Sequence, residues 1–119
     1  IGSPSMNFLR GRLDDPGQGL SFVSHSGAWV PLPERPDKQP SGPLTLGIRP
    51  EHLELSSQDA PGSFSVQAVV VEPTGPQTQI VARAGTDEVT ALLNGRFPVR
   101  PGETIWLRPL PSTLHFFRE

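Results

Sequence analysis

Short apolar runs separated by turn residues constrain the fold of this chain more than any other feature of its sequence. Runs of about four to eight residues recur from Met6 to Phe117, and many are rich in β-branched or aromatic side chains. None keeps a helical period of 3.6 residues over ten or more positions. Turn-forming segments such as Asp14–Gly17, Thr74–Pro76 and Pro101–Glu103 lie between the runs. The pattern predicts an all-β domain of about eight to ten short strands, folded as a small barrel or sandwich.

Length and composition predict a single domain over residues 1–119. A chain of this size can bury one modest core. Fifteen prolines and twelve glycines approach the composition of a disordered segment, but the regular apolar runs favour a folded domain. The stretch Pro33–Pro43 holds four prolines and is predicted to be a mobile loop. Because the chain begins with Ile1 instead of methionine, we expect it to be a piece of a longer protein.

Charge and residue usage exclude several classes of function. The net charge is −2 and the only lysine is Lys38, so the basic excess typical of nucleic-acid binding is missing. The absence of cysteine excludes disulfides, thiolate catalysis and cysteine-ligated zinc. No apolar run approaches the roughly 20 residues that a helix needs to span a bilayer.

Two parts of the sequence match each other at a fixed offset. Thr45–Pro50 reads T-L-G-I-R-P and Thr104–Pro109 reads T-I-W-L-R-P, and each block is followed by a histidine beside a leucine. The same offset aligns further strand and hairpin patterns. We therefore expect two diverged half-units, about residues 1–59 and 60–119, that share one core. A chance match is the alternative, because the motif is short.

The segment Leu46–Leu53 combines a strand end with three polar side chains. Its apolar part stops at Arg49, because Pro50 lacks an amide donor and holds the preceding residue in an extended conformation. Glu51 and His52 follow at once. From the residues alone, the segment fits a catalytic loop, a metal site or a structural corner.

Catalytic and metal-binding partners for this corner are missing from the sequence. The three histidines, His25, His52 and His115, are dispersed, and Glu51 and His52 would point to opposite faces of a strand. The chain has no G-x-S-x-G elbow, no P-loop and no G-x-G-x-x-G followed by a helix. We therefore predict no catalytic, cofactor-binding or metal site. Instead, we expect a structural corner in which Arg49 and Glu51 form a salt link that holds the loop backbone.

The end segment Leu114–Arg118 predicts an interaction surface. If it forms a strand, one of its two adjacent aromatic rings must point away from the core. We predict that His115, Phe116 and Phe117 form an interface, with the outward ring as its anchor.

Five segments resemble the ATP-binding subunits of maltose-type and other sugar-type ABC importers. In chain order they are Ile1–Leu9 (I-G-S-P-S-M-N-F-L), Gly47–Leu53 (G-I-R-P-E-H-L), Val71–Thr78 (V-E-P-T-G-P-Q-T), Pro101–Glu103 (P-G-E) and Leu114–Phe117 (L-H-F-F). The resemblance spans the whole chain, although Pro76 and Phe116 depart from residues usual in the family. It implies a C-terminal regulatory domain of the transport-associated OB (TOBE) type, a β-barrel-like unit of OB character. The family markers at the corner are Gly47, Arg49, Pro50, Glu51 and His52.

The resemblance also implies a function and partners. The chain would be a non-catalytic regulatory and dimerisation domain of an importer for sugars or related carbohydrates, while ATP and Mg²⁺ would bind to a nucleotide-binding domain upstream. Its partners would be its own twin in a homodimer, that upstream domain, the permease subunits through the parent and a regulatory protein. Neither nucleic acid nor direct membrane insertion is expected. The parent would lie at the cytoplasmic face of the inner membrane of a bacterium or archaeon, as a peripheral subunit.

Two alternatives remain open. A small-molecule sensor for an oxyanion or sugar would use Arg49 and Arg108, which the internal repeat makes equivalent. An oligonucleotide-binding OB protein would need exposed aromatic rings beside cations, for which Phe97 between Arg96 and Arg100 is the local candidate. The three hypotheses predict, respectively, self-association, a ligand-induced thermal shift, and salt-dependent binding to single strands.

Overall fold

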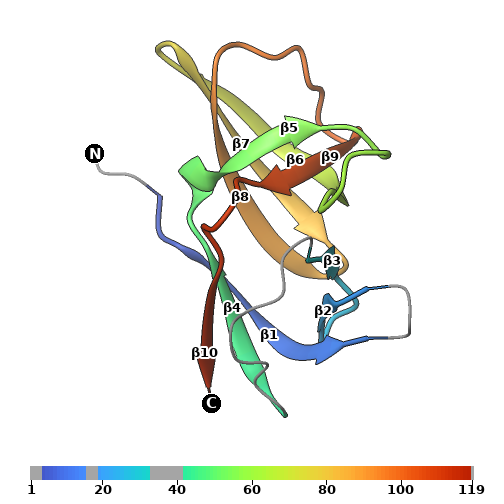
Figure 1. Ribbon diagram of the computed structural model, residues 1–119. Helices are drawn as coiled ribbons and strands as arrows, with labels where there is room; N and C mark the ends of the chain where they lie inside the picture. Colours follow the sequence, from blue (N-terminus) through green and yellow to red (C-terminus); the bar gives the residue numbers. More distant parts are fainter. Residues whose placement is uncertain (1–3, 16–18, 33–41, 119) are drawn as a thin grey trace.

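The computed structural model describes residues 4–15, 19–32 and 42–118 (Figure 1). The described chain forms ten strands and one short 3₁₀ helix, which confirms the predicted all-β fold. Most of the predicted mobile loop Pro33–Pro43 falls outside the described residues. The elements are β1 (Asn7–Asp14), β2 (Ser21–Ser24), β3 (Trp29–Pro31), β4 (Leu44–Ile48), η1 (Pro50–His52), β5 (Leu53–Ser56), β6 (Phe64–Thr74), β7 (Gln77–Ala84), β8 (Asp87–Asn94), β9 (Thr104–Pro109) and β10 (His115–Arg118).

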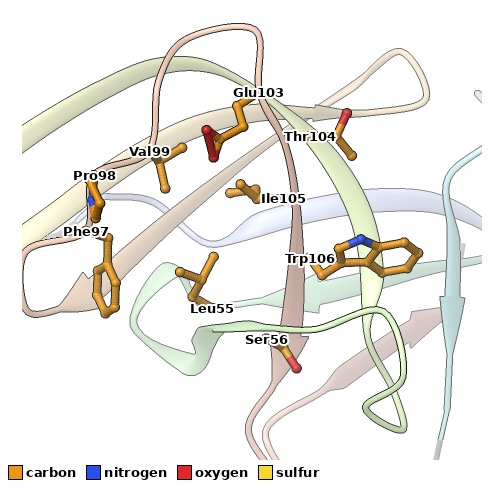
Figure 2. Close-up of a pocket in the computed structure, with 9 residues that line it drawn as sticks. All are labelled: Leu55, Ser56, Phe97, Pro98, Val99, Glu103, Thr104, Ile105 and Trp106. Carbon is orange, nitrogen blue, oxygen red and sulfur yellow. The ribbon is translucent and has the colours of Figure 1, made fainter.

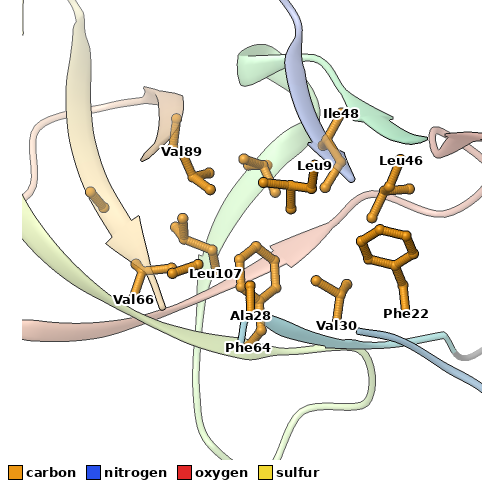
Figure 3. Packing of buried hydrophobic residues seen from close by; sticks show 14 of the residues in the cluster. Leu9, Phe22, Ala28, Val30, Leu46, Ile48, Phe64, Val66, Val89 and Leu107 are labelled. Carbon is orange, nitrogen blue, oxygen red and sulfur yellow. The ribbon is translucent and has the colours of Figure 1, made fainter. Parts of the chain in front are cut away.

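The strands form two antiparallel sheets around one core. Sheet A has the order β10-β4-β1-β2-β3, and sheet B has the order β5-β9-β6-β7-β8 (Figure 1). Buried side chains from both sheets belong to a single cluster, seen in Figure 3. Phe22 and Leu46 contribute to it from sheet A, and Val66 and Leu107 contribute from sheet B. The two sheets therefore bury their apolar faces against each other, as a sandwich requires.

Alternation along the strands explains which side chains enter the core. In β1, Asn7, Leu9 and Gly11 are buried while the residues between them are exposed. β6 begins with the same alternation, but its register shifts between Ala68 and Val70. Such a bulge adds a residue to one strand, and here it leaves two neighbouring valines exposed.

The two sheets have the same strand order when each strand is matched with the one five places later. β1 to β4 take the places in sheet A that β6 to β9 take in sheet B. The last strands are exchanged, because β5 completes sheet B and β10 completes sheet A. The registers agree as well: Gly47 faces His115, and Trp106, the repeat counterpart of Gly47, faces Ser56, the repeat counterpart of His115.

Because the end strands are exchanged, the two predicted half-units are not separate structural units. Neither of the predicted segments, about 1–59 and 60–119, forms a complete sheet by itself, since each contributes its last strand to the other sheet. The common topology supports the internal duplication, which stays a prediction.

Two polar contacts join the sheets near their ends. The buried Asn7 side chain on β1 donates from Nδ2 to the carbonyl oxygens of Ile48 (3.0 Å) and Thr90 (2.9 Å), and its Oδ1 accepts from the Thr90 amide (2.8 Å). Elsewhere, the Ser26 hydroxyl in the β2–β3 turn donates to the Asp87 carboxylate at the start of β8. Asn7 thus links β1 directly to the edge strand β8 of the other sheet.

Candidate functional site

The predicted corner is a short 3₁₀ turn closed by backbone hydrogen bonds. Pro50 is buried at the first position of η1, where its fixed φ suits the turn. The His52 amide donates to the Arg49 carbonyl at 2.9 Å. The Leu110 amide donates to the His52 carbonyl at 2.8 Å, which ties the corner to the segment after β9.

The salt link predicted between Arg49 and Glu51 is wrong. Both residues are exposed, and neither forms an ion pair with another described residue. The ion pair lies instead between Arg108 and Glu54, where Arg108 Nε donates to Glu54 Oε1 at 2.7 Å across the β5–β9 pair. In the internal repeat Thr113 is the counterpart of Glu54, so the equivalent position for Arg49 carries no carboxylate.

Replacing Arg49 with alanine should change the free energy of unfolding by less than about 0.5 kcal/mol, because exposed side chains without specific contacts contribute little. Urea denaturation of both chains at one pH measures the difference. Arg108→Ala is the matched control, and loss of its half-exposed ion pair should cost up to about 1 kcal/mol. If Arg49→Ala lowered the free energy of unfolding more than Arg108→Ala, Arg49 would have a structural role.

Gly47 has a packing role that the sequence did not reveal. Its Cα lies beneath two side chains on the outer face of sheet A, and a Cβ there would lie 2.7 Å from Met6 Sδ and 3.0 Å from Phe117 Cε2. Only a residue without a side chain leaves both groups in place. His52, at the other end of the motif, is half-buried, and its Nδ1 has no hydrogen-bond partner among the described residues.

The outward ring of the end strand is Phe117. Phe116 packs against the core, whereas His115 and Phe117 point away from it. Phe117 is 46% exposed and makes an edge contact with Phe8 at a centroid distance of 6.1 Å, and it stacks with His115 at 6.4 Å. Sequence reasoning missed Phe8, although its place between the core positions Asn7 and Leu9 is a signal that could have revealed it.

A hollow of about 320 Å³ lies between β5, β9 and the loop before β9 (Figure 2). Phe97, Leu55 and Ile105 give it apolar walls, and Glu103 adds a carboxylate. Neither Arg49 nor Arg108 lines it, so this hollow lacks the positive donors that bind an oxyanion. Phe97, the candidate stacking ring, packs partly against the core instead of lying open. The ligand hypothesis for the two arginines stays a prediction.

Among the described residues, no group of three or more histidine or acidic side chains lies close enough to hold a metal ion. The described part of the chain also contains no helix that is long and apolar enough to cross a membrane.

Family models match most of the chain. Residues 2–53 match the MalK OB fold domain, and residues 46–117 match the TOBE domain. The chain is a TOBE domain. Within it, the segment Gly47–Leu53 that resembles the importer subunits is the corner from β4 through η1 into β5, where the chain leaves sheet A and enters sheet B.

Curated relatives of this TOBE domain are ATP-binding proteins. It is 42% identical over 117 residues to the ABC transporter ATP-binding protein y4oS of Sinorhizobium fredii (strain NBRC 101917 / NGR234), a match covering 98% of this chain and 30% of that protein. It is 34% identical to the sn-glycerol-3-phosphate import ATP-binding protein UgpC of Escherichia coli (strain K12), covering 98% of this chain and 32% of that protein. The TOBE domain thus spans about one third of the length of these relatives.

A solved structure shows the same fold. The cytoplasmic molybdate-binding protein ModG, with molybdate bound, superposes with a TM-score of 0.69 over 100% of this chain and 99% of that chain. The sequence identity is 10%, so this likeness speaks for the fold of the TOBE domain alone.

Proposed function

We propose that this TOBE domain is the non-catalytic accessory domain of the ATP-binding subunit of an ABC importer. The observation that carries the proposal is the similarity to y4oS and UgpC over 98% of the chain, which is confined to about a third of those proteins. In this role ATP and Mg²⁺ bind to the nucleotide-binding part of the parent. We infer that the transported compound is a sugar or a related carbohydrate; the name of UgpC supports a polar compound of this kind, since it refers to sn-glycerol 3-phosphate, a polyol phosphate.

The same proposal assigns partners and a place. The TOBE domain stabilises a dimer of ATP-binding subunits by contact with its twin, and it reaches the permease through its parent at the cytoplasmic face of the inner membrane. A regulatory protein that docks on the domain would adjust transport. What supports these assignments is the family of the relatives and the compact two-sheet core, which can present surfaces on both outer faces.

A chimera tests the proposal in cells. The aligned third of Escherichia coli UgpC is replaced by this chain, and uptake of sn-glycerol 3-phosphate is measured in cells without native UgpC. We expect uptake above that of a UgpC truncation that lacks the aligned third, because the domain supplies an accessory part that the truncation lacks. In parallel, isothermal titration of the isolated chain with MgATP should give no heat of binding.

Two results would contradict the proposal. A chimera that is expressed at native levels but transports no better than the truncation would remove the accessory role. Saturable binding of MgATP to the isolated chain would remove its non-catalytic character. Sedimentation velocity of the isolated chain adds a test of the dimer role, which predicts self-association at high concentration.

A further inference from the structure

The hollow beside β9 lies where that strand continues past the end of β5. The pairing of β5 with β9 stops at Ser56 and Trp106, but β9 itself begins at Thr104. The opposite edge of β9 is covered by β6 over this part. On the β5 side, no described strand lies beside Thr104 and Ile105, and the loop before β9 encloses the space instead (Figure 2). The hollow therefore occupies the place that a longer β5 would take.

Hydrogen bonds hold the enclosing loop in a defined shape. The Val99 amide donates to the Phe97 carbonyl at 2.9 Å, and Pro98 between them has a restricted φ. Further along the loop, the Gly102 amide donates to the Ala68 carbonyl on β6 at 2.7 Å. The walls of the hollow are thus in place before a ligand arrives, so binding costs little conformational freedom.

The lining of the hollow combines apolar walls with one carboxylate. Leu55, Phe97 and Val99 pack partly against the core, and Ile105 is buried in it. Among the described residues that line the hollow, Glu103 is the only charged one. Figure 2 shows its carboxylate directed toward the space between Val99 and Ile105. A ligand that matches this lining has an apolar body and a positive charge.

The Glu103 carboxylate is not neutralised by an ion pair with another described residue. Arg96, in the same loop, donates to a carbonyl in the β6–β7 turn at 3.0 Å, and Arg108 binds a carboxylate on β5. Arg100 is exposed and does not line the hollow. The carboxylate is therefore available to a cationic ligand.

We propose that the hollow binds a small organic cation, an amine with a compact apolar body. Its ammonium group lies at the Glu103 carboxylate, and its apolar body contacts Leu55, Phe97 and Val99. The face of an aromatic ring attracts a cation, so Phe97 and Glu103 favour the same charge. The volume of about 320 Å³ is at the small end for ligand pockets, which span roughly 300–1,000 Å³, and this suits a compact amine.

Two other ligand charges are disfavoured by the same lining. An anion would meet the carboxylate with a like charge, and a neutral apolar molecule would leave the carboxylate without a partner. A free amine and the lysine side chain of a protein partner share the favoured chemistry, and separate probes distinguish these two sources. The proposal concerns the hollow alone and does not rest on the importer function.

The experiment titrates the ¹⁵N-labelled chain, which has a core of its own, and follows its amide resonances. Three probes share one carbon skeleton and differ in charge at neutral pH: 3-methylbutylamine, 3-methylbutan-1-ol and 3-methylbutanoate. We expect only the amine to cause saturable shifts, centred on residues 55–56 and 97–106. Raising NaCl from about 50 to about 300 mM should weaken its binding.

A fourth probe, Nα-acetyl-lysine N-methylamide, identifies the source of the cation. Saturable shifts at the same residues with an affinity equal to or above that of 3-methylbutylamine support the side chain of a protein partner. A lower affinity supports a free amine as the ligand. Both results agree with a cation site at Glu103.

Variants test the role of the carboxylate. Glu103→Gln keeps the size of the side chain but removes its charge, and it should lower the affinity for 3-methylbutylamine at least about fivefold. Glu103 is exposed, so the core resonances should keep their positions and report an intact fold. Glu72→Gln is the matched control on β6, outside the hollow, and should leave the affinity unchanged. Arg100→Gln removes a nearby cation and should not lower the affinity.

Several results would overturn the proposal. Absence of saturable shifts with the amine would show that the hollow does not bind this class of ligand. Equal or tighter binding of the alcohol or the carboxylate would remove the selection for a positive charge. Equal effects of Glu103→Gln and Glu72→Gln, or weaker binding to Arg100→Gln, would remove the role of the Glu103 carboxylate. The UgpC chimera reports on the importer function separately, so either proposal can fail while the other stands.

Discussion

Replacing Asn7 with alanine should lower the free energy of unfolding by about 2–4 kcal/mol, because the change removes the partner of one buried and two half-buried backbone groups. The Asn7 side chain satisfies the carbonyl of Ile48 and both the carbonyl and the amide of Thr90. These bonds join residues 41 and 83 positions apart and hold β1 against the edge of the other sheet. Urea denaturation followed by tryptophan fluorescence measures the loss.

A substitution that keeps the shape of the Asn7 side chain separates the effect of lost hydrogen bonds from the effect of lost side-chain volume. Asn7→Asp keeps the acceptor for the Thr90 amide but removes both donated bonds and places an acidic group against two carbonyl oxygens. It should therefore destabilise the chain at least as much as Asn7→Ala at neutral pH. Asn94→Asp is the control, since Asn94 is exposed and its side chain, among the described residues, only accepts a bond from the Gln77 side chain. Equal effects at positions 7 and 94 would rule out the linking role of Asn7.

Replacing Gly11 with alanine should cost about 3 kcal/mol or more, since overpacking against backbone cannot be relieved by turning a side chain. A Cβ at Gly11 would lie 2.0 Å from the Val23 carbonyl oxygen and 2.7 Å from Ser24 Cα, on the neighbouring strand β2. Strand β1 would have to move away from β2 to make room. The shift of the urea midpoint, together with circular dichroism of the native state, measures the effect.

Gly47→Ala provides the matched comparison within the same sheet. The atoms nearest to its Cβ belong to the side chains of Met6 and Phe117, which can move, so its cost should stay near about 1 kcal/mol. If Gly47→Ala lowered the free energy of unfolding as much as Gly11→Ala, the side chains of Met6 and Phe117 would be unable to move aside.

The sequence predicted the strands well because their cause is local. The alternation of buried and exposed residues along β1 depends only on neighbouring positions, with Asn7, Leu9 and Gly11 buried. The same holds for the turns in which Gly27 or Gly85 adopts a positive φ. The internal repeat also predicted that β4 and β9 are equivalent strands. The family resemblance at Gly47–Leu53 and at the chain's ends anticipated the TOBE match.

The pairing of strands and the roles of single residues could not be predicted in this way. Local sequence patterns do not show whether β5 joins sheet A with β1 to β4 or joins sheet B, because the choice depends on contacts between distant segments. Arg49 and Glu51 looked like partners because they are close in sequence, yet the 3₁₀ turn exposes both. The acid that binds Arg108 lies on a strand 54 residues away. Asn7 looked like part of a family motif, and its contacts across the two sheets explain why an amide suits that position.

The exchanged end strands also set the order in which the chain can fold during synthesis. Strand β4 offers one edge to β1 and leaves the other open until the residues of β10 have left the ribosome. Strand β5, in turn, cannot pair with sheet B until β9 has been made. The first half therefore keeps an unpaired edge while the second is translated, and both sheets are complete only after most of the second half has been made. Such dependence on late, distant contacts favours slow folding as one unit, during which the open edge of β4 must stay apart from the edges of other chains.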